Sequence, residues 1–125
     1  MTAIIITIDG HSFRGEIDAS ETAQCILAIL PMEATATRWG DEFYFAIPVQ
    51  LIEAADARAE VEVGTLAYWP PGNAFCIFFG PTPVSRGNEP RAYSPVNPFG
   101  HLLDDVTPLR GINSGTKIKV AVGNQ

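Results

Sequence analysis

The chain has 125 residues, of which 46% are hydrophobic and 18% are charged. This size and composition predict one domain over residues 1–125 with a packed core, and they exclude an intrinsically disordered chain. The formal net charge is −6 and the eight lysines and arginines are scattered, so neither nucleic acid nor an anionic membrane surface is expected as a partner.

Two strands joined by a tight turn are predicted at the start of the chain. Residues 3–8 are β-rich, Asp9-Gly10 is a hairpin turn signal, and residues 12–17 alternate between polar and apolar side chains. The opening apolar run is too short to span a bilayer and lacks the pattern of a secretory signal, so we expect a cytoplasmic protein without membrane segments.

A helix is predicted over residues 19–30, followed by a series of strands. Asp18 and Glu21 have the spacing of a capping box, and Pro31 ends the helix. Strands are then expected at 35–39, 42–47, 58–63, 66–69 and 74–79. In the second of these, Phe43, Phe45 and Ile47 lie on one face while Glu42, Tyr44 and Ala46 lie on the other.

The last third of the chain is rich in prolines and glycines. We expect an irregular loop over residues 80–98, a short strand near 99–103, a helical turn near 104–110 and a final strand over 116–122. The chain therefore contains roughly eight strands and one or two helices, a pattern typical of a β-barrel or sandwich.

Three stretches combine polar and aromatic residues in ways that suggest a binding site. Residues 38–45 place an arginine, two acids and a tyrosine around a turn or β-bulge, and a guanidinium suits a carboxylate or a polarised carbonyl. Residues 67–83 provide aromatics for an apolar pocket and the loop Gly80–Pro83 at its rim. Residues 94–101 include Asn97, which can hydrogen-bond a ligand. The alternatives are a surface ion pair, core packing and a side chain that caps its own turn.

Other chemistry has little support in the sequence. We find no nucleophile elbow, phosphate loop or dinucleotide-binding motif. Cys25 and Cys76 lie among apolar neighbours and are interpreted as buried free thiols, and no metal or cofactor is expected. Pairing of His101 with Asp104 or Asp105, or with Cys76, is a weaker alternative.

The chain resembles the small prokaryotic cyclophilin-like family, and most of its length carries the resemblance. The matching runs are 38–42 with 44–45, Gly64, 67–72 and 74–83, extended by 85–87 and 94–97. The resemblance implies a mainly β fold, a closed eight-stranded barrel with helices covering its ends. It does not imply prolyl isomerisation, because Arg38 is followed by Trp-Gly-Asp-Glu and the Phe-Met and Gln-Gly-Gly partners of true cyclophilins are absent.

We consider three functions. The first is a binding module that holds a small molecule or short peptide in a barrel-side pocket. Its predicted ligand-binding residues are Arg38 as an anion anchor, Glu42, the walls Tyr44, Phe75 and Phe79, and the orienting side chains Thr82 and Asn97. The second is an enzyme, either a divergent peptidyl-prolyl cis-trans isomerase or another small enzyme. The third is an interaction protein that acts as a homodimer or as the subunit of another protein, through aromatics near residues 93–99.

Overall fold

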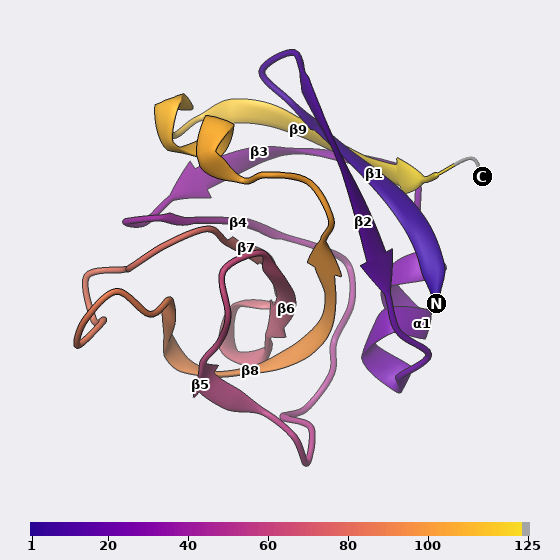
Figure 1. Ribbon diagram of the computed structural model, residues 1–125. Helices are drawn as coiled ribbons and strands as arrows, with labels where there is room; N and C mark the ends of the chain where they lie inside the picture. The colour runs from indigo at the N-terminus through magenta and orange to yellow at the C-terminus, as the bar shows by residue number, and fades with distance from the viewer. Residues whose placement is uncertain (124–125) are drawn as a thin grey trace.

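Eight strands form a closed antiparallel ring in the computed structural model, which describes residues 1–123 (Figure 1). A ninth strand, β5, pairs with β8 outside the ring. The expected mainly β fold with a closed eight-stranded barrel is therefore confirmed. Around the ring, the strands follow the order β2 (His11–Ile17), β1 (Thr2–Ile8), β9 (Thr116–Val122), β3 (Met32–Arg38), β4 (Glu42–Ala46), β7 (Ala74–Phe78), β6 (Thr65–Trp69) and β8 (Arg91–Leu102), which pairs with β2.

The opening hairpin lies where the sequence predicts it, whereas the helix is shorter than the predicted range 19–30 at both ends and has a different N-cap. Helix α1 spans Glu21–Leu27, and its cap is Ser20, whose Oγ accepts a hydrogen bond from the Ala23 backbone N–H at 3.1 Å. Asp18 instead accepts from the Ser20 N–H, so it supports the cap without being the cap. Within residues 1–123, no helix is long and apolar enough to cross a membrane.

The largest correction concerns β8. A loop through residue 98 is expected, but twelve residues form one strand that contacts β2, β5 and β6. Pro98 is accommodated because the register with β6 shifts there: Ala67 pairs with Pro98 and Leu66 with Gly100. A bulge is one of the few places in a sheet where a proline fits.

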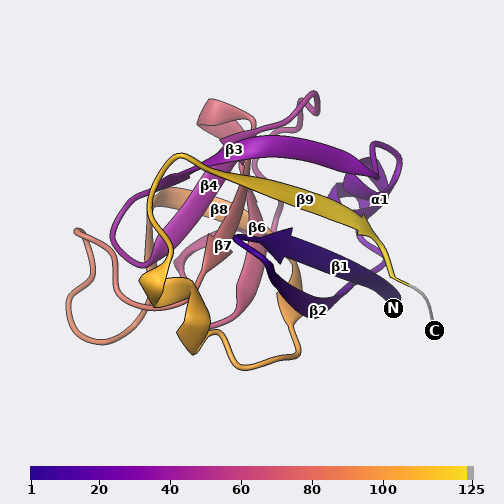
Figure 2. The same ribbon diagram turned by 90° about the horizontal axis from the view of Figure 1, so that it is seen from above.

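Smaller differences occur at the other connections. Strand β5 is shorter than predicted and covers only Arg58–Glu60. The turn at Pro70–Gly72 is a 3-10 helix, η1, and the helical turn expected near 104–110 is a second one, η2, at Thr107–Gly111. The connection between β7 and β8 projects from one end of the molecule, away from α1 (Figure 2).

The strands β4, β6 and β7 separate two apolar regions. Their inward-facing side chains join those of the other ring strands and α1 in one large core, which includes Phe43, Phe45 and Phe75. Their opposite face carries a smaller cluster with Ala67, Cys76 and Val96, against which Tyr44 and Trp69 pack. The alternation predicted for residues 42–47 thus places successive side chains in different regions.

Candidate functional site

An apolar pocket of about 340 Å³ opens on the outer face of β4, β6, β7 and β8. Four aromatic side chains line it: Trp39, Tyr44, Trp69 and Tyr93. The remaining apolar wall is formed by Cys76, Val84, Ala92 and Val96. This volume lies at the lower end of the range for ligand pockets, which are typically lined by apolar and aromatic groups with a few polar ones.

The aromatic rings are arranged around Tyr93. Its ring lies 6.4 Å from that of Trp39 at 70° and 6.3 Å from that of Trp69 at 90°, so both contacts are edge-to-face. The indole N–H of Trp69 donates to Ser94 Oγ at 2.7 Å, which fixes the ring on β8. Tyr93 itself is 74% exposed, so it stands at the mouth of the pocket.

Glu42 is the one acidic group in the pocket wall among the described residues. Only 5% of the residue is exposed, and its Oε1 has no hydrogen-bond partner within residues 1–123. Burial raises the pKa of Glu42 to about 7, and the Cys76 thiol opposes part of that rise. A buried carboxyl oxygen without a partner destabilises a folded protein, so stability does not explain the presence of Glu42.

Cys76 faces Glu42 but has the wrong properties for a nucleophile. It is fully buried, and burial first, then the neighbouring Glu42 charge, raises the pKa of its thiol well above the usual value. The reactive form of cysteine is the thiolate, so this thiol is inert at neutral pH. The prediction of a buried free thiol is confirmed for Cys76, whereas Cys25 is only partly buried.

Two glycines allow the β3–β4 turn to present Trp39 and Glu42 at the pocket edge. Gly40 has a φ of +60°, and a Cβ there would lie 2.8 Å from the Thr82 Cα. A Cβ on Gly80 would collide with the Asp41 side chain. The Asp41 backbone N–H donates to Pro81 O, and the Asp41 backbone O accepts a hydrogen bond from the Phe79 N–H. The loop Gly80–Pro83 therefore packs against the β3–β4 turn and holds it in place.

Arg38 lies outside the pocket lining and its donors are largely used within the protein. Its Nε donates to Gly40 O at 2.8 Å, and its Nη1 donates to Arg110 O and Ile112 O at 2.8 and 2.9 Å. Its Nη2 donates to Asp41 Oδ1 at 3.0 Å. Four of the five N–H groups of the guanidinium are thus occupied, and they tie η2 to the β3–β4 turn.

The structure brings together two of the seven predicted ligand-binding residues, Glu42 and Tyr44. Phe75 and Phe79 are fully buried in the barrel core, and the Arg38 guanidinium lies 5.1 Å over the Phe79 ring. The two polar candidates hold loops in place. The Thr82 hydroxyl donates to Arg91 O, and the Asn97 side chain bonds the connection between β4 and β5.

Asn97 anchors the connection between β4 and β5. Its Oδ1 accepts from the Ala54 N–H at 2.8 Å, and its Nδ2 donates to Ile52 O at 3.0 Å. It is 1% exposed and lies on the opposite face of β8 from its neighbour Val96, which lines the pocket. The side chain is therefore committed to the fold.

Strand register explains which pocket residues the sequence analysis missed. Tyr44 pairs with Cys76 and not with Phe75, so β7 contributes Cys76 to the pocket lining and directs Phe75 into the barrel core. Trp39 and Trp69 lie in stretches singled out from the sequence, but pairing across β6, β7 and β8 is needed to place them beside Tyr93. The alternation of residues 42–45 could have identified part of the pocket from the sequence. It places Glu42 and Tyr44 on the face of β4 opposite the core residues Phe43 and Phe45.

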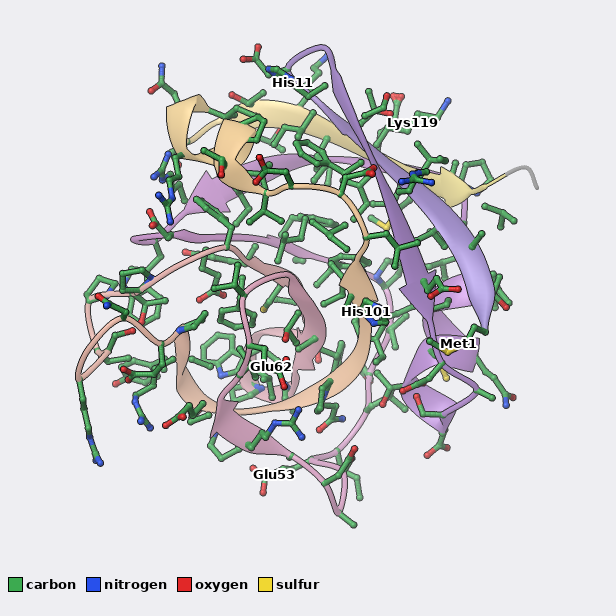
Figure 3. The ribbon with its side chains drawn as sticks, viewed as in Figure 1. Met1, His11, Glu53, Glu62, His101 and Lys119 are labelled. Atoms are coloured by element: carbon green, nitrogen blue, oxygen red, sulfur yellow. The ribbon has the colours of Figure 1, made fainter. Side chains whose placement is uncertain are left out.

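The two histidines lie apart on the molecule (Figure 3). His11 is exposed at the start of β2, and His101 lies on β8, 3.9 Å from Glu16. Asp104 pairs with Arg14 and Asp105 accepts from Thr107. No group of three potential metal ligands of the histidine, cysteine or carboxylate type occurs within residues 1–123.

Comparison with known proteins agrees with this architecture. A family model described as cyclophilin-like matches residues 2–121. The solution structure of a hypothetical protein from Archaeoglobus fulgidus is similar over 98% of this chain and 95% of that chain, with a TM-score of 0.82 and 34% sequence identity. No curated protein matches. The family match covers all the strands of the ring except the last residue of β9, and we conclude that the chain belongs to the cyclophilin-like family.

Proposed function

We propose that this protein is a binding module whose outer pocket holds a small, mostly apolar molecule or the corresponding end of a short peptide. The observation that carries the proposal is the carboxyl of Glu42, buried without a hydrogen-bond partner for Oε1 in an aromatic-lined cavity. Proteins rarely leave a buried polar atom unpaired. A ligand that bonds to this carboxyl accounts for it.

Both tryptophans of the chain, Trp39 and Trp69, line the pocket. Intrinsic tryptophan fluorescence therefore reports on the pocket alone. We expect a screen of small apolar molecules bearing one polar group to give saturable fluorescence changes. The same molecules should raise the unfolding midpoint, because a ligand that binds only the folded state stabilises it.

A matched pair of variants locates the binding. Ala92→Leu adds volume inside the pocket, whereas Ala46→Leu adds the same volume at an exposed position of β4. We expect Ala92→Leu to abolish the fluorescence response and Ala46→Leu to retain it. Equal responses in the two variants would contradict binding in this pocket.

A catalytic role for Glu42 is the second candidate, and its pKa of about 7 favours it. A general acid or base works best when its pKa lies near the working pH. If Glu42 transfers protons, molecules that bind the pocket should exchange carbon-bound protons with deuterated water, and Glu42→Gln should stop the exchange. If no bound molecule exchanges its protons, the catalytic role is contradicted and only the binding role remains.

Prolyl isomerisation has less support from the geometry. It would need a donor aimed at the prolyl amide, and Arg38, the candidate in the sequence, has four of its five N–H groups occupied by Gly40, Asp41, Arg110 and Ile112. The fold alone would suggest this activity only by analogy. A coupled proline-isomerisation assay should therefore give no rate above background.

A further inference from the structure

The residues around Glu42 indicate which polar group a ligand would present to its carboxyl. We propose that the ligand of the pocket is an organic cation, a protonated amine attached to a small apolar body. This inference depends on the proposed function of the pocket as a ligand-binding site. The amine would lie against the Glu42 carboxyl, inside the ring of aromatic side chains formed by Trp39, Tyr44, Trp69 and Tyr93.

The charge balance around Glu42 is the first argument. The arginines on the neighbouring elements already have acidic partners: Arg38 pairs with Asp41 at 3.0 Å, and Arg91 pairs with Glu60 at 2.8 Å and Glu89 at 3.2 Å. Within residues 1–123, no lysine, arginine or histidine lines the pocket. A positive charge that meets the Glu42 carboxylate must therefore come from the ligand.

The aromatic walls are the second argument. The faces of tryptophan and tyrosine rings attract cations, most strongly where water is excluded. Trp69 uses its indole N–H on Ser94, so only its ring surface is available to a ligand. An amine between these rings and a carboxylate would have favourable contacts on several sides.

Hydrogen bonding narrows the type of cation. An ionised carboxylate only accepts hydrogen bonds, and Oε1 of Glu42 has no donor among the described residues. A primary or secondary ammonium brings N–H donors, whereas a quaternary ammonium brings none. The pocket should therefore prefer a protonated amine that retains N–H groups.

Binding of such a cation should be coupled to a proton. The titratable groups that line the pocket with Glu42 are Cys76 from β7, Tyr44 from β4 and Tyr93 from β8. The charged groups on flanking elements are Asp41 with Arg38 and Arg110, and Arg91 with Glu60 and Glu89. Burial raises the pKa of Glu42 to about 7, so a cation that requires the ionised form displaces a proton at lower pH. Its affinity should fall up to tenfold per pH unit below 7.

The test uses three probes with the same apolar body: cyclohexylmethylammonium, cyclohexylmethyl-trimethylammonium and neutral cyclohexylmethanol. Each is titrated against the intact protein at pH 8 and pH 6, with tryptophan fluorescence and the unfolding midpoint as readouts. We expect the primary ammonium to bind at least tenfold more tightly than the alcohol at pH 8 and more tightly than the quaternary compound. We also expect that preference over the alcohol to shrink at pH 6.

Two variants separate the charge of Glu42 from the net charge of the protein. Glu42→Gln should remove the preference for the ammonium and its pH dependence while the alcohol still binds. Glu53→Gln removes one negative charge at an exposed position outside the pocket (Figure 3) and should behave like the wild type.

The outcomes distinguish this inference from the proposed function. If the alcohol binds as tightly as the ammonium, or if Glu42→Gln leaves the preference intact, the pocket remains a ligand site but the cation proposal is wrong. If none of the three probes changes the fluorescence or the unfolding midpoint up to its solubility limit, both the ligand site and the cation proposal are contradicted.

Discussion

The two faces of strands β4, β6 and β7 both carry aromatic side chains, but they differ in whether their buried polar groups have hydrogen-bond partners. On the inner face, the Tyr68 hydroxyl is fully buried and lies within hydrogen-bond distance of Val49 O, Leu51 N and Asn73 Oδ1. On the outer face, Glu42 is buried as well, yet its Oε1 has no partner within residues 1–123. The hydrogen bonds of Tyr68 stabilise the inner face, whereas the unpaired oxygen of Glu42 supports the proposal that the outer face binds a ligand.

The largest expected effect comes from truncating the inner face. Phe75 is fully buried, stacks on Phe45 at 5.0 Å and meets Phe99 edge-to-face at 5.2 Å. Phe75→Ala should lower the free energy of unfolding by about 3–5 kcal/mol through lost contacts and a cavity. Tyr93→Ala, on the exposed side of the pocket, should cost about 1 kcal/mol or less. Denaturant unfolding of both variants checks the contrast, and equal losses would contradict it.

The second prediction concerns the pH dependence of stability. The pKa of Glu42 rises from 4.5 to about 7 on folding, so the folded protein binds more protons than the unfolded chain between these values. Stability contributed by the protonated form is therefore lost as pH rises through this window. The full loss above pH 7 is on the order of 3 kcal/mol, and about 2 kcal/mol of it falls between about pH 5.5 and about pH 8.

Glu42→Gln isolates this effect, because the amide does not titrate. Unfolding curves at both pH values should show the wild type weakening at pH 8, whereas the variant should not, so the variant should be the more stable protein there. The lowered pKa values of Asp104, Asp105 and Glu89 act only at more acidic pH. A wild type that keeps its stability up to pH 8 would mean that the carboxyl has a compensating partner.

The third prediction separates Arg38 from ligand recognition. Arg38→Lys keeps the charge but cannot reproduce the four hydrogen bonds to Gly40, Asp41, Arg110 and Ile112. We expect the free energy of unfolding to fall by about 1–3 kcal/mol, while the preference of the folded variant for ammonium over alcohol persists. A variant of unchanged stability that prefers anionic probes less than the wild type would restore the anion-anchor role.

The smallest predicted effect is on the aromatic wall. Tyr93→Leu keeps an apolar side chain at the pocket mouth but removes the electron-rich ring. Cation–π contacts contribute about 0.5–2 kcal/mol, so ammonium affinity should fall roughly 2- to 30-fold. The affinity for the matched alcohol should change much less, and isothermal titration calorimetry with both probes measures the difference. Equal losses for the two probes would indicate packing alone.

Much of the fold could be predicted because alternation and turn residues act locally. The Asp9-Gly10 hairpin, the alternating strand from residue 42 and the last strand depend on short-range patterns. Strand β8 could not be predicted in the same way, because its prolines favour a loop and only its bulged pairing with β6 makes room for Pro98. The ring closes only through this strand, so the resemblance to the cyclophilin-like family was needed to predict closure.

The pocket was harder to predict than the fold because it depends on the register between strands and on which acceptors occupy the N–H groups of Arg38. The sequence places Arg38 beside a possible pocket, but only the structure shows that Arg110 O and Ile112 O take two of its N–H groups. Conversely, the sequence leaves open whether Arg38 pairs with Asp41 or with Glu42, and the β3–β4 turn brings Asp41 to the guanidinium. Such choices between adjacent acids depend on side-chain direction at a turn, which composition and spacing do not specify.

The role of Glu42 is tested most directly by a carbon-13 NMR titration of its side-chain carboxyl, assigned with Glu42→Gln, in the free protein and with cyclohexylmethylammonium. We expect a midpoint near pH 7 in the free protein and a lower midpoint when the ammonium is bound, because the cation stabilises the ionised form. A midpoint close to the ordinary glutamate value in the free protein, or one that the bound ammonium does not lower, would contradict this role.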